Sequence, residues 1–227
     1  MYMPNIISKN ARIACGVKIG ENVIIKDTVE IGENTIIANN VIIEKGTVIG
    51  RNCIIGNNTI LGNTPERIGK VSPLILEDSV KIGDNVTIYA GSKLMKNVVV
   101  EDLSTIGELT IIGQNSYIAT GVFLGSNVLL GNSVEIGPRT YVSSYSSIKD
   151  HCRIGAHVKL SEELAKKSYE TNVPIGTIIE KNCKIGDNTL ILHGIRIGES
   201  VVVLEGSRVI CDLDSNKIYG GNPAVQI

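Results

Sequence analysis

The segment Ile31–Asn63 reads IGENTIIANNVIIEKGTVIGRNCIIGNNTILGN, and an aliphatic residue returns at every sixth position along it. This period fits neither the 3.6-residue turn of an α-helix nor the two-residue alternation of a β-strand. Six residues are enough for a short strand followed by a tight turn. The segment therefore predicts a coil built from repeated strand-and-turn units.

The six-residue repeat extends over nearly the whole chain of 227 residues. Nine hexads begin at Ile7, fourteen begin at Leu76 and six begin at Ile179, and all 29 leading positions hold Ile, Leu or Val. The fifth place of a hexad holds a small residue, usually Val or Thr. The third and fourth places are rich in Asn, Gly and Asp, which tolerate positive φ and suit tight corners.

Each hexad then supplies one large and one small inward side chain before the chain bends. Three hexads would close one triangular coil, and successive coils would pair as parallel strands about 4.8 Å apart. An interior of stacked aliphatic side chains explains why the chain has one Phe and no Trp. The cysteines at fifth places, Cys53, Cys152 and Cys183, are interpreted as small buried hydrophobic residues.

The composition excludes several classes of protein. The chain is 43% hydrophobic and 20% charged, with a net charge of −1 and no cluster of Lys and Arg, which argues against a nucleic-acid partner. No apolar run is long enough to cross a membrane, and the N-terminus lacks the layout of a signal peptide, so the sequence predicts a cytoplasmic protein without a membrane partner. The five cysteines form no C-x-x-C pair, and no metal site is predicted.

The repeat resembles that of the hexapeptide-repeat, left-handed parallel β-helix family. The resemblance implies an all-β fold, with residues 1–227 forming a single left-handed β-helix domain of about ten coils, on the order of 45 Å long. The left hand comes from the family, because it is an exception to the usual crossover rule. The family also implies a homotrimer. Apolar residues expected to point outward agree with such an interface, although they could equally be ordinary exposed surface residues. They are Ile24, Ile36, Ile42, Ile54 and Leu129.

Two loops interrupt the register of the hexads. Loop 63–75 contains two prolines and the charged residues Glu66, Arg67 and Lys70. Loop 161–178 opens with the helix-capable run Ser161–Lys167, where a serine is followed directly by two glutamates. Loops that leave a solenoid without disturbing its register often line a binding surface, so both loops are predicted to form walls of a site. The alternative is that they are surface insertions without a function.

The C-terminal tail, residues 214–227, closes with Gly-Gly-Asn-Pro-Ala and is similar to the end of hexapeptide acyltransferases that use coenzyme A. In those relatives the cofactor lies in a groove between two prisms of a trimer, with its nucleotide end near the last coils. The resemblance implies acetyl-CoA as co-substrate. The residues that it places beside the cofactor are Arg196, Arg208 and Lys217 for the phosphates, the backbone near Ser207 for the pantetheine arm, and Asn222 with Pro223 in the tail. A Lys or Arg usually follows the alanine, but this chain has Val225.

Acyl transfer from a thioester needs a base for the attacking hydroxyl or amine. In many relatives a histidine at the third place of a hexad acts as this base. The layout of the chain looks most like the branch of the family that acetylates nucleotide-linked sugars. Glu108 takes the corresponding place, and a carboxylate becomes an effective base when its surroundings raise its pKa; an exposed corner charge is the alternative interpretation. Glu108 is the first candidate base, with His157 and His193 as further candidates.

His193 also occupies a third place, about four coils or roughly 19 Å from Glu108. This separation is near the reach of an extended pantetheine arm. If the nucleotide end lies beside the last coils, the thioester arrives near Glu108, and His193 is expected to line the cofactor groove. His151 and His157 occupy fourth places, which are usually solvated corners, and His157 directly precedes the second loop.

The leading hypothesis is an acetyl-CoA-dependent acetyltransferase acting on an amino or hydroxyl group of a nucleotide-linked sugar. The acceptor would attack the thioester directly, because no Cys or Ser is placed to form an acyl-enzyme. One alternative is a non-catalytic scaffold, which the glutamate at position 108 and Val225 would both permit. Another is a metal enzyme similar to the γ-type carbonic anhydrases, in which three histidines bind zinc between subunits.

Overall fold

The computed structural model describes residues 4–64, 71–161 and 176–227, and across these ranges the chain forms β-strands without an α-helix. Most strands are two residues long and repeat every six residues. Ser161 is the only part of the predicted helical run that is described; residues 162–167, like Glu66, Arg67 and Lys70, lie outside the described ranges. No helix in the described ranges is long and apolar enough to cross a membrane.

The strands form three parallel sheets, which we call A, B and C. The strands of sheet A are β1 (Ile6–Ile7), β4 (Ile24–Ile25), β7 (Ile42–Ile43), β10 (Ile60–Asn63), β13 (Thr87–Tyr89), β16 (Thr105–Ile106), β19 (Phe123–Leu124), β22 (Tyr141–Val142), β25 (Lys159–Leu160), β28 (Leu190–Ile191) and β31 (Arg208–Val209). The strands of sheet B are β2 (Arg12–Ile13), β5 (Glu30–Ile31), β8 (Val48–Ile49), β11 (Ile75–Leu76), β14 (Lys93–Leu94), β17 (Ile111–Ile112), β20 (Leu129–Leu130), β23 (Ser147–Ile148), β26 (Ile178–Ile179) and β29 (Arg196–Ile197). The strands of sheet C are β3 (Lys18–Ile19), β6 (Ile36–Ile37), β9 (Ile54–Ile55), β12 (Lys81–Ile82), β15 (Val99–Val100), β18 (Tyr117–Ile118), β21 (Glu135–Ile136), β24 (Arg153–Ile154), β27 (Lys184–Ile185), β30 (Val202–Val203), β32 (Ile218–Gly220) and β33 (Val225–Gln226).

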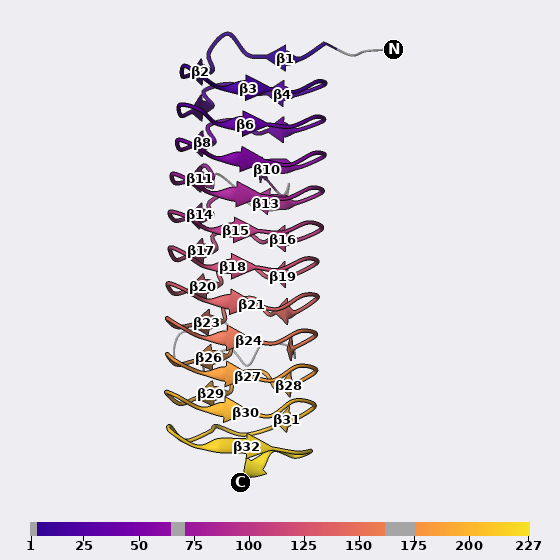
Figure 1. Ribbon diagram of the computed structural model, residues 1–227, viewed down its shortest axis with the longest axis vertical. Helices are drawn as coiled ribbons and strands as arrows, with labels where there is room; N and C mark the ends of the chain where they lie inside the picture. The colour runs from indigo at the N-terminus through magenta and orange to yellow at the C-terminus, as the bar shows by residue number, and fades with distance from the viewer. Residues whose placement is uncertain (1–3, 65–70, 162–175) are drawn as a thin grey trace.

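Up to β31, consecutive strands lie in different sheets and each strand pairs with the strand three earlier in the chain; at the C-terminus β32 pairs with β30. The result is the tall three-sided prism of Figure 1, with the N-terminus at one end and the C-terminus at the other. The all-β parallel β-helix predicted from the hexads is confirmed. Sheet A contributes one strand to each turn and has 11 strands, so the prism has about eleven turns rather than ten.

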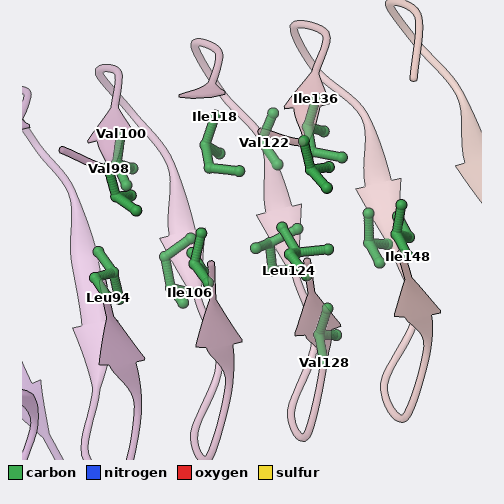
Figure 2. Close-up of a cluster of buried hydrophobic side chains, with 14 of the residues drawn as sticks. Leu94, Val98, Val100, Ile106, Ile118, Val122, Leu124, Val128, Ile136 and Ile148 are labelled. Carbon is green, nitrogen blue, oxygen red and sulfur yellow. The ribbon is translucent and has the colours of Figure 1, made fainter. Parts of the chain in front are cut away.

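The core is a stack of aliphatic side chains from the first and fifth hexad places. In Figure 2, leading residues such as Leu94, Ile106 and Leu124 lie among smaller fifth-place residues such as Val98 and Val128. All five of these side chains are at most 1% exposed. Burial of each large aliphatic side chain contributes roughly 1.5 to 3 kcal/mol, so the repeat itself is the source of stability.

Buried Ser and Thr residues at fifth places follow a regular hydrogen-bonding rule. Their hydroxyl groups donate to the carbonyl 15 residues later in the chain, as Thr35 does to Gly50 at 2.9 Å and Thr110 does to Gly125 at 3.0 Å. This satisfies a polar group in an otherwise apolar interior. Where the rule fails, the structure has departed from the plain repeat.

The fourth hexad place forms the corner in the left-handed backbone region. Twenty-two non-glycine residues have positive φ there, and many of them are asparagines, for example Asn22 at 55° and Asn127 at 58°. Asn adopts this conformation at low cost, which explains its recurrence in the sequence. Bulkier residues at the same place, including Leu109 at 58° and Tyr145 at 63°, pay a larger cost.

The two ends of the prism differ. In the first turn the leading residues Ile7 and Ile13 are 41% and 38% exposed, because no described rung covers them. At the other end the tail predicted over 214–227 contains β32, which extends sheet C, and β33, which folds back antiparallel to it. The last corner is shortened, so that Leu213 lies beneath Ile197 instead of taking a fifth place.

Candidate active site

Both insertions leave the prism at the same edge. The first connects β10 to β11 and the second connects β25 to β26, and each pair runs from sheet A to sheet B. We call the column of corners that join sheet A to sheet B the A/B edge. The loops predicted to wall a site are therefore aligned on one edge, although the second begins 86 positions after the first ends, at residues 161 and 75.

Glu108 lies on the A/B edge, in the corner between β16 and β17. Its side chain belongs to a residue that is only 8% exposed, so the structure does not support the interpretation of an ordinary solvated corner charge. The backbone N–H of Asn127 donates to the Glu108 carbonyl at 2.8 Å, which fixes this corner to the turn below it. A buried carboxylate at a corner is a group for which a polar partner is expected.

The end of the first insertion packs on the corners beside Glu108. An ideal Cβ on Gly91 would lie 2.7 Å from a methyl group of Leu109 and 2.7 Å from a methyl group of Val71. Pro73 lies in the same way against Gly46, where an ideal Cβ would be 3.1 Å from its ring. Both glycines have positive φ and leave room for the returning chain. The insertion therefore meets the A/B edge next to the Glu108 corner.

His193 lies on the same edge, in the corner between β28 and β29. Both ring nitrogens are buried, and neither has a hydrogen-bond partner among the residues that the structure describes. A neutral imidazole has one N–H donor and one acceptor nitrogen, and a buried polar atom without a partner costs about 1 to 3 kcal/mol. Such an unsatisfied ring marks a place where a ligand or an ordered water is expected.

Three hydroxyl groups near His193 are also buried without partners. They belong to Ser147 on β23, to Ser161 directly after β25, and to Thr177 directly before β26. Thr177 breaks the fifth-place rule, since its hydroxyl does not reach the carbonyl 15 residues later, at Leu192. Among the described residues, the base of the second insertion therefore holds three of the four hydroxyl groups that are buried without a partner; the fourth belongs to Thr47.

Glu108 and His193 are four turns apart along the A/B edge. Sheet A steps from β16 through β19, β22 and β25 to β28, and each step is one rung of about 4.8 Å. The separation of roughly 19 Å expected from the sequence therefore holds along a single edge. The second insertion emerges between them, one turn before His193.

The other two histidines lie elsewhere. His157, in the corner between β24 and β25, joins sheet C to sheet A, and His151 joins sheet B to sheet C. Both have positive φ, at 54° and 60°, as expected for the fourth hexad place. One chain therefore does not bring the three histidines together, and His157 does not share an edge with Glu108.

The residues predicted to hold the cofactor phosphates come from all three faces. Arg208 on β31 and Arg196 on β29 flank the A/B edge in the last turns, on sheets A and B. Arg196 donates to the Glu180 carboxylate at 2.8 Å, while no ion pair of Arg208 is found in the described ranges. Lys217 precedes β32 in sheet C and pairs with Asp214 at 2.8 Å. This pairing lowers the pKa of Asp214 and raises the pKa of Lys217.

The remaining predicted cofactor residues surround Arg208. Ser207 is buried, and its hydroxyl donates to the Leu204 carbonyl at 2.6 Å, so its side chain is used inside the prism. The tail passes beneath β31, where the Arg208 N–H donates to the Gly221 carbonyl at 2.9 Å. Asn222 and Pro223, joined by a cis peptide bond, follow in this connection. Val225 lies on β33 and is 60% exposed.

Two open hollows among the described residues lie away from the A/B edge. One, of about 500 Å³, lies on sheet C beside Tyr117 and Pro138, and the other, of about 620 Å³, lies on sheet B beside Arg12 and Asp78. Neither contains a predicted site residue.

Two features of this edge were not predicted from the sequence. The unsatisfied hydroxyl groups at the base of the second insertion depend on contacts that only the fold creates. The outward side chains of Phe123 and Tyr141 stack on adjacent rungs of sheet A. The two residues are 18 positions apart, which is three hexads or one full turn. Their placement on adjacent rungs could therefore have been predicted from the sequence.

Two family models match the chain. One is described as the bacterial transferase hexapeptide and matches residues 28–63 and 79–114; the other, described as the hexapeptide repeat of succinyl-transferase, matches residues 104–138 and 176–207. Together they cover more than half of the chain. No curated protein matches it significantly.

Solved structures with a similar fold include several acyltransferases. An Arabidopsis UDP-N-acetylglucosamine acyltransferase is 15% identical, with a TM-score of 0.56 over 98% of this chain and 72% of that chain. A UDP-N-acetylglucosamine acyltransferase from Bacteroides fragilis is 22% identical, over 100% and 74%, with a TM-score of 0.48. PerB from Caulobacter crescentus, solved with CoA and GDP-perosamine, is 15% identical, over 100% and 58%, with a TM-score of 0.29. The Arabidopsis enzyme shares its fold with this chain. The other two structures have TM-scores below 0.5 and support no conclusion about it.

Proposed function

We propose, on the premise that this chain belongs to the hexapeptide-repeat transferases with a left-handed β-helix, that it transfers an acetyl group from acetyl-CoA to a hydroxyl or amino group of a sugar, in nucleotide-linked form. The observation that carries the proposal is the A/B edge. There, the corners that carry both insertions, the buried side chain of Glu108 and the unsatisfied ring of His193 are aligned over six turns, from β10 to β28.

In the proposed reaction the acceptor attacks the thioester carbonyl directly. The Glu108 carboxylate takes the proton from the attacking hydroxyl or amine as the new C–O or C–N bond forms. The C–S bond then breaks, and the CoA sulfur leaves as a thiolate that is reprotonated. Acetyl-CoA supplies the activated acyl group, and the protein supplies orientation and the base.

The proposed cofactor lies along the A/B edge with its nucleotide end beside the last turns. Arg208 flanks the edge there, and its guanidinium group suits a phosphate partner. Arg196 would have to exchange its contact with Glu180 for one with the cofactor. The pantetheine arm would then pass His193, whose unsatisfied nitrogens suit an amide partner, and would bring the thioester toward Glu108, roughly 19 Å away.

The proposed site needs a second prism. In this proposal the groove forms where the surface of a second prism covers the A/B edge. A homotrimer would supply that surface three times. Among the outward residues predicted to support association, Ile36, Ile54 and Leu129 are 42%, 43% and 46% exposed, so they remain available for burial.

The proposal is tested by measuring release of the CoA thiol from acetyl-CoA in the presence of UDP-, GDP- and dTDP-linked hexoses and aminohexoses. Glu108→Gln removes the base but keeps the size of the side chain, so kcat should fall by about 10² to 10⁴ while acetyl-CoA still binds. The matched control is Glu205→Gln, because Glu205 takes the same third hexad place on a corner between sheets C and A. That variant should retain the activity of the natural chain.

The competing function is a non-catalytic scaffold. Failure of millimolar acetyl-CoA to raise the Tm of the natural chain would favour it, since a bound ligand must stabilise the folded state. If acetyl-CoA binds and is used but Glu108→Gln keeps full activity, the transfer stands and the base is another group, with His193 the next to replace.

A further inference from the structure

The only phenylalanine of the chain stands on the outside of the prism. Phe123 is 40% exposed on β19, and its ring stacks on that of Tyr141 one rung below, with centroids 5.0 Å apart and planes 3° from parallel. Neither ring belongs to the buried core cluster, so this pair is not part of the interior packing. Stacked outward aromatic rings are the kind of surface that binds flat ligands.

Only one face of the Phe123 ring is covered by the stack. On the other side its partner in the sheet is Thr105 on β16, and the next rung holds Thr87 on β13. The centroid separation in the stack matches the spacing of the rungs, so the rings follow the axis of the prism. Two small side chains that end in hydroxyl groups therefore adjoin the uncovered face of Phe123.

This open face adjoins the proposed base. Thr105 begins β16, and Glu108 forms the corner three residues later, on the same turn. Three residues span at most about 10 Å. A ring that rests on Phe123 above Thr105 can therefore direct a substituent toward the corner that holds Glu108.

We propose that Phe123 is the platform for the pyranose ring of the acceptor sugar, with Thr105 and Thr87 offering hydrogen bonds to its hydroxyl groups. This rests on the proposed function and adds the residue that selects and orients the acceptor. The apolar face of the sugar lies on the aromatic ring, and the group to be acetylated points toward Glu108. Proximity of this kind lowers the barrier by fixing the attacking atom.

The charge around this platform favours a sugar over a nucleobase. A base on Phe123 would bring the adjoining diphosphate close to the Glu108 carboxylate. Among the described residues on these rungs of sheet A, Thr87, Thr105 and Phe123 carry no charge that would offset that repulsion. A neutral sugar ring meets no such penalty, and the diphosphate of a nucleotide-linked sugar would lie farther from Glu108.

The test uses ligand-observed saturation-transfer NMR with UDP-, GDP- and dTDP-linked hexoses on the full chain. In the natural protein the strongest saturation should fall on the protons of the hexose ring. Two variants remove the platform in different ways: Phe123→Leu deletes the ring, and Thr105→Phe fills the sugar position with a third ring. Each should weaken hexose binding by about three- to tenfold.

The controls separate binding from folding and association. Tyr117→Leu removes an aromatic ring that is 42% exposed on sheet C and should leave hexose binding unchanged. Thr105→Phe extends the aromatic stack, so its Tm should equal or exceed that of the natural chain. The molar mass of each variant in solution should also be unchanged, because a change would place Phe123 in a subunit interface and overturn the proposal.

Three results would overturn the inference. They are saturation that falls on the nucleoside protons instead of the hexose, full hexose binding in both Phe123→Leu and Thr105→Phe, or no hexose saturation in the natural chain. The proposed function fails in a different way. In that case no acceptor releases CoA from acetyl-CoA, whatever the binding of hexoses shows.

Discussion

At the residue scale, the hexad place of a residue decides its environment. Cys53, Cys152 and Cys183 take fifth places and are at most 1% exposed, which confirms that they are buried hydrophobic residues. Burial is the main cause that raises the pKa of Cys53. The thiol contact with Cys183, together with burial, raises the pKa of Cys152. Cys15 and Cys211 lie on the surface.

Thiol reactivity tests this assignment. With a chromogenic disulfide reagent at pH 8, the native chain should react at the two exposed cysteines, and all five should react after denaturation. The thiolate is the reactive form, and burial opposes both its formation and its contact with the reagent. Rapid modification of Cys53 or Cys152 in the native chain would contradict the assignment.

One of these thiols, Cys53, makes stability depend on pH. Its ordinary pKa is 9.0, and burial raises it in the folded state, whereas Cys152 and Cys183 form a hydrogen-bonded pair whose pKa values shift in opposite directions. The folded state therefore favours the protonated Cys53 thiol, and this contribution is complete below pH 9. It should decline as the pH rises above 9, where the unfolded thiol ionises first.

The candidate site residues show how far residue-level reasoning reaches. The third hexad place identified Glu108 and His193 as corner residues, and the structure places both on one edge. The hexad place could not show that Glu108 is 8% exposed or that the nitrogens of His193 have no partner among the described residues, because both depend on tertiary contacts. His157 is also a candidate catalytic residue from the sequence, but it lies on another edge.

At the element scale, the functional arrangement depends on corners that stack in register. Gly107 precedes Glu108, and an ideal Cβ there would lie 2.6 Å from the carbonyl carbon of Gly125 and 2.7 Å from its oxygen. The close approach of backbone to backbone explains the glycine at this second hexad place. It also fixes the height of the Glu108 corner above the next turn.

Gly107→Ala and Gly194→Ala form a matched pair. Gly107→Ala must push two backbones apart, so the free energy of unfolding should fall by at least about 2 kcal/mol. An added Cβ at Gly194, where φ is +69°, would meet no atom within 4 Å, and the cost should be the conformational one of about 1 kcal/mol. Unfolding in denaturant measures both, and equal costs would show that the turns can separate freely.

At the scale of the whole molecule, the prism is closed at one end only. The tail forms β32 and β33 beneath the last turn, while the first turn leaves Ile7 and Ile13 more than a third exposed. The faces between the ends also carry outward isoleucines that stack in the sheet, such as Ile36 and Ile54. Association with another copy would bury these exposed apolar side chains.

The proposed trimer gives a direct prediction. Light scattering of the purified chain should report a molar mass close to three times 24.3 kDa. Dilution that dissociates the trimer should abolish acetyl transfer while each prism stays folded, because the groove needs two copies. A monomer that is fully active would contradict the shared site and would require the A/B edge to work alone.

The sequence by itself determined the coil, because a six-residue repeat of large and small aliphatic residues can be buried only by strands that turn three times per rung. It also determined which residues stand at corners, since Asn and Gly mark the positive φ values. Only the tertiary structure decided which corners share an edge. Each insertion replaces one corner of a turn, so residues 85 positions apart, Glu108 and His193, come to lie on a single edge, and the packing of the returning chain decides which of their polar atoms are buried.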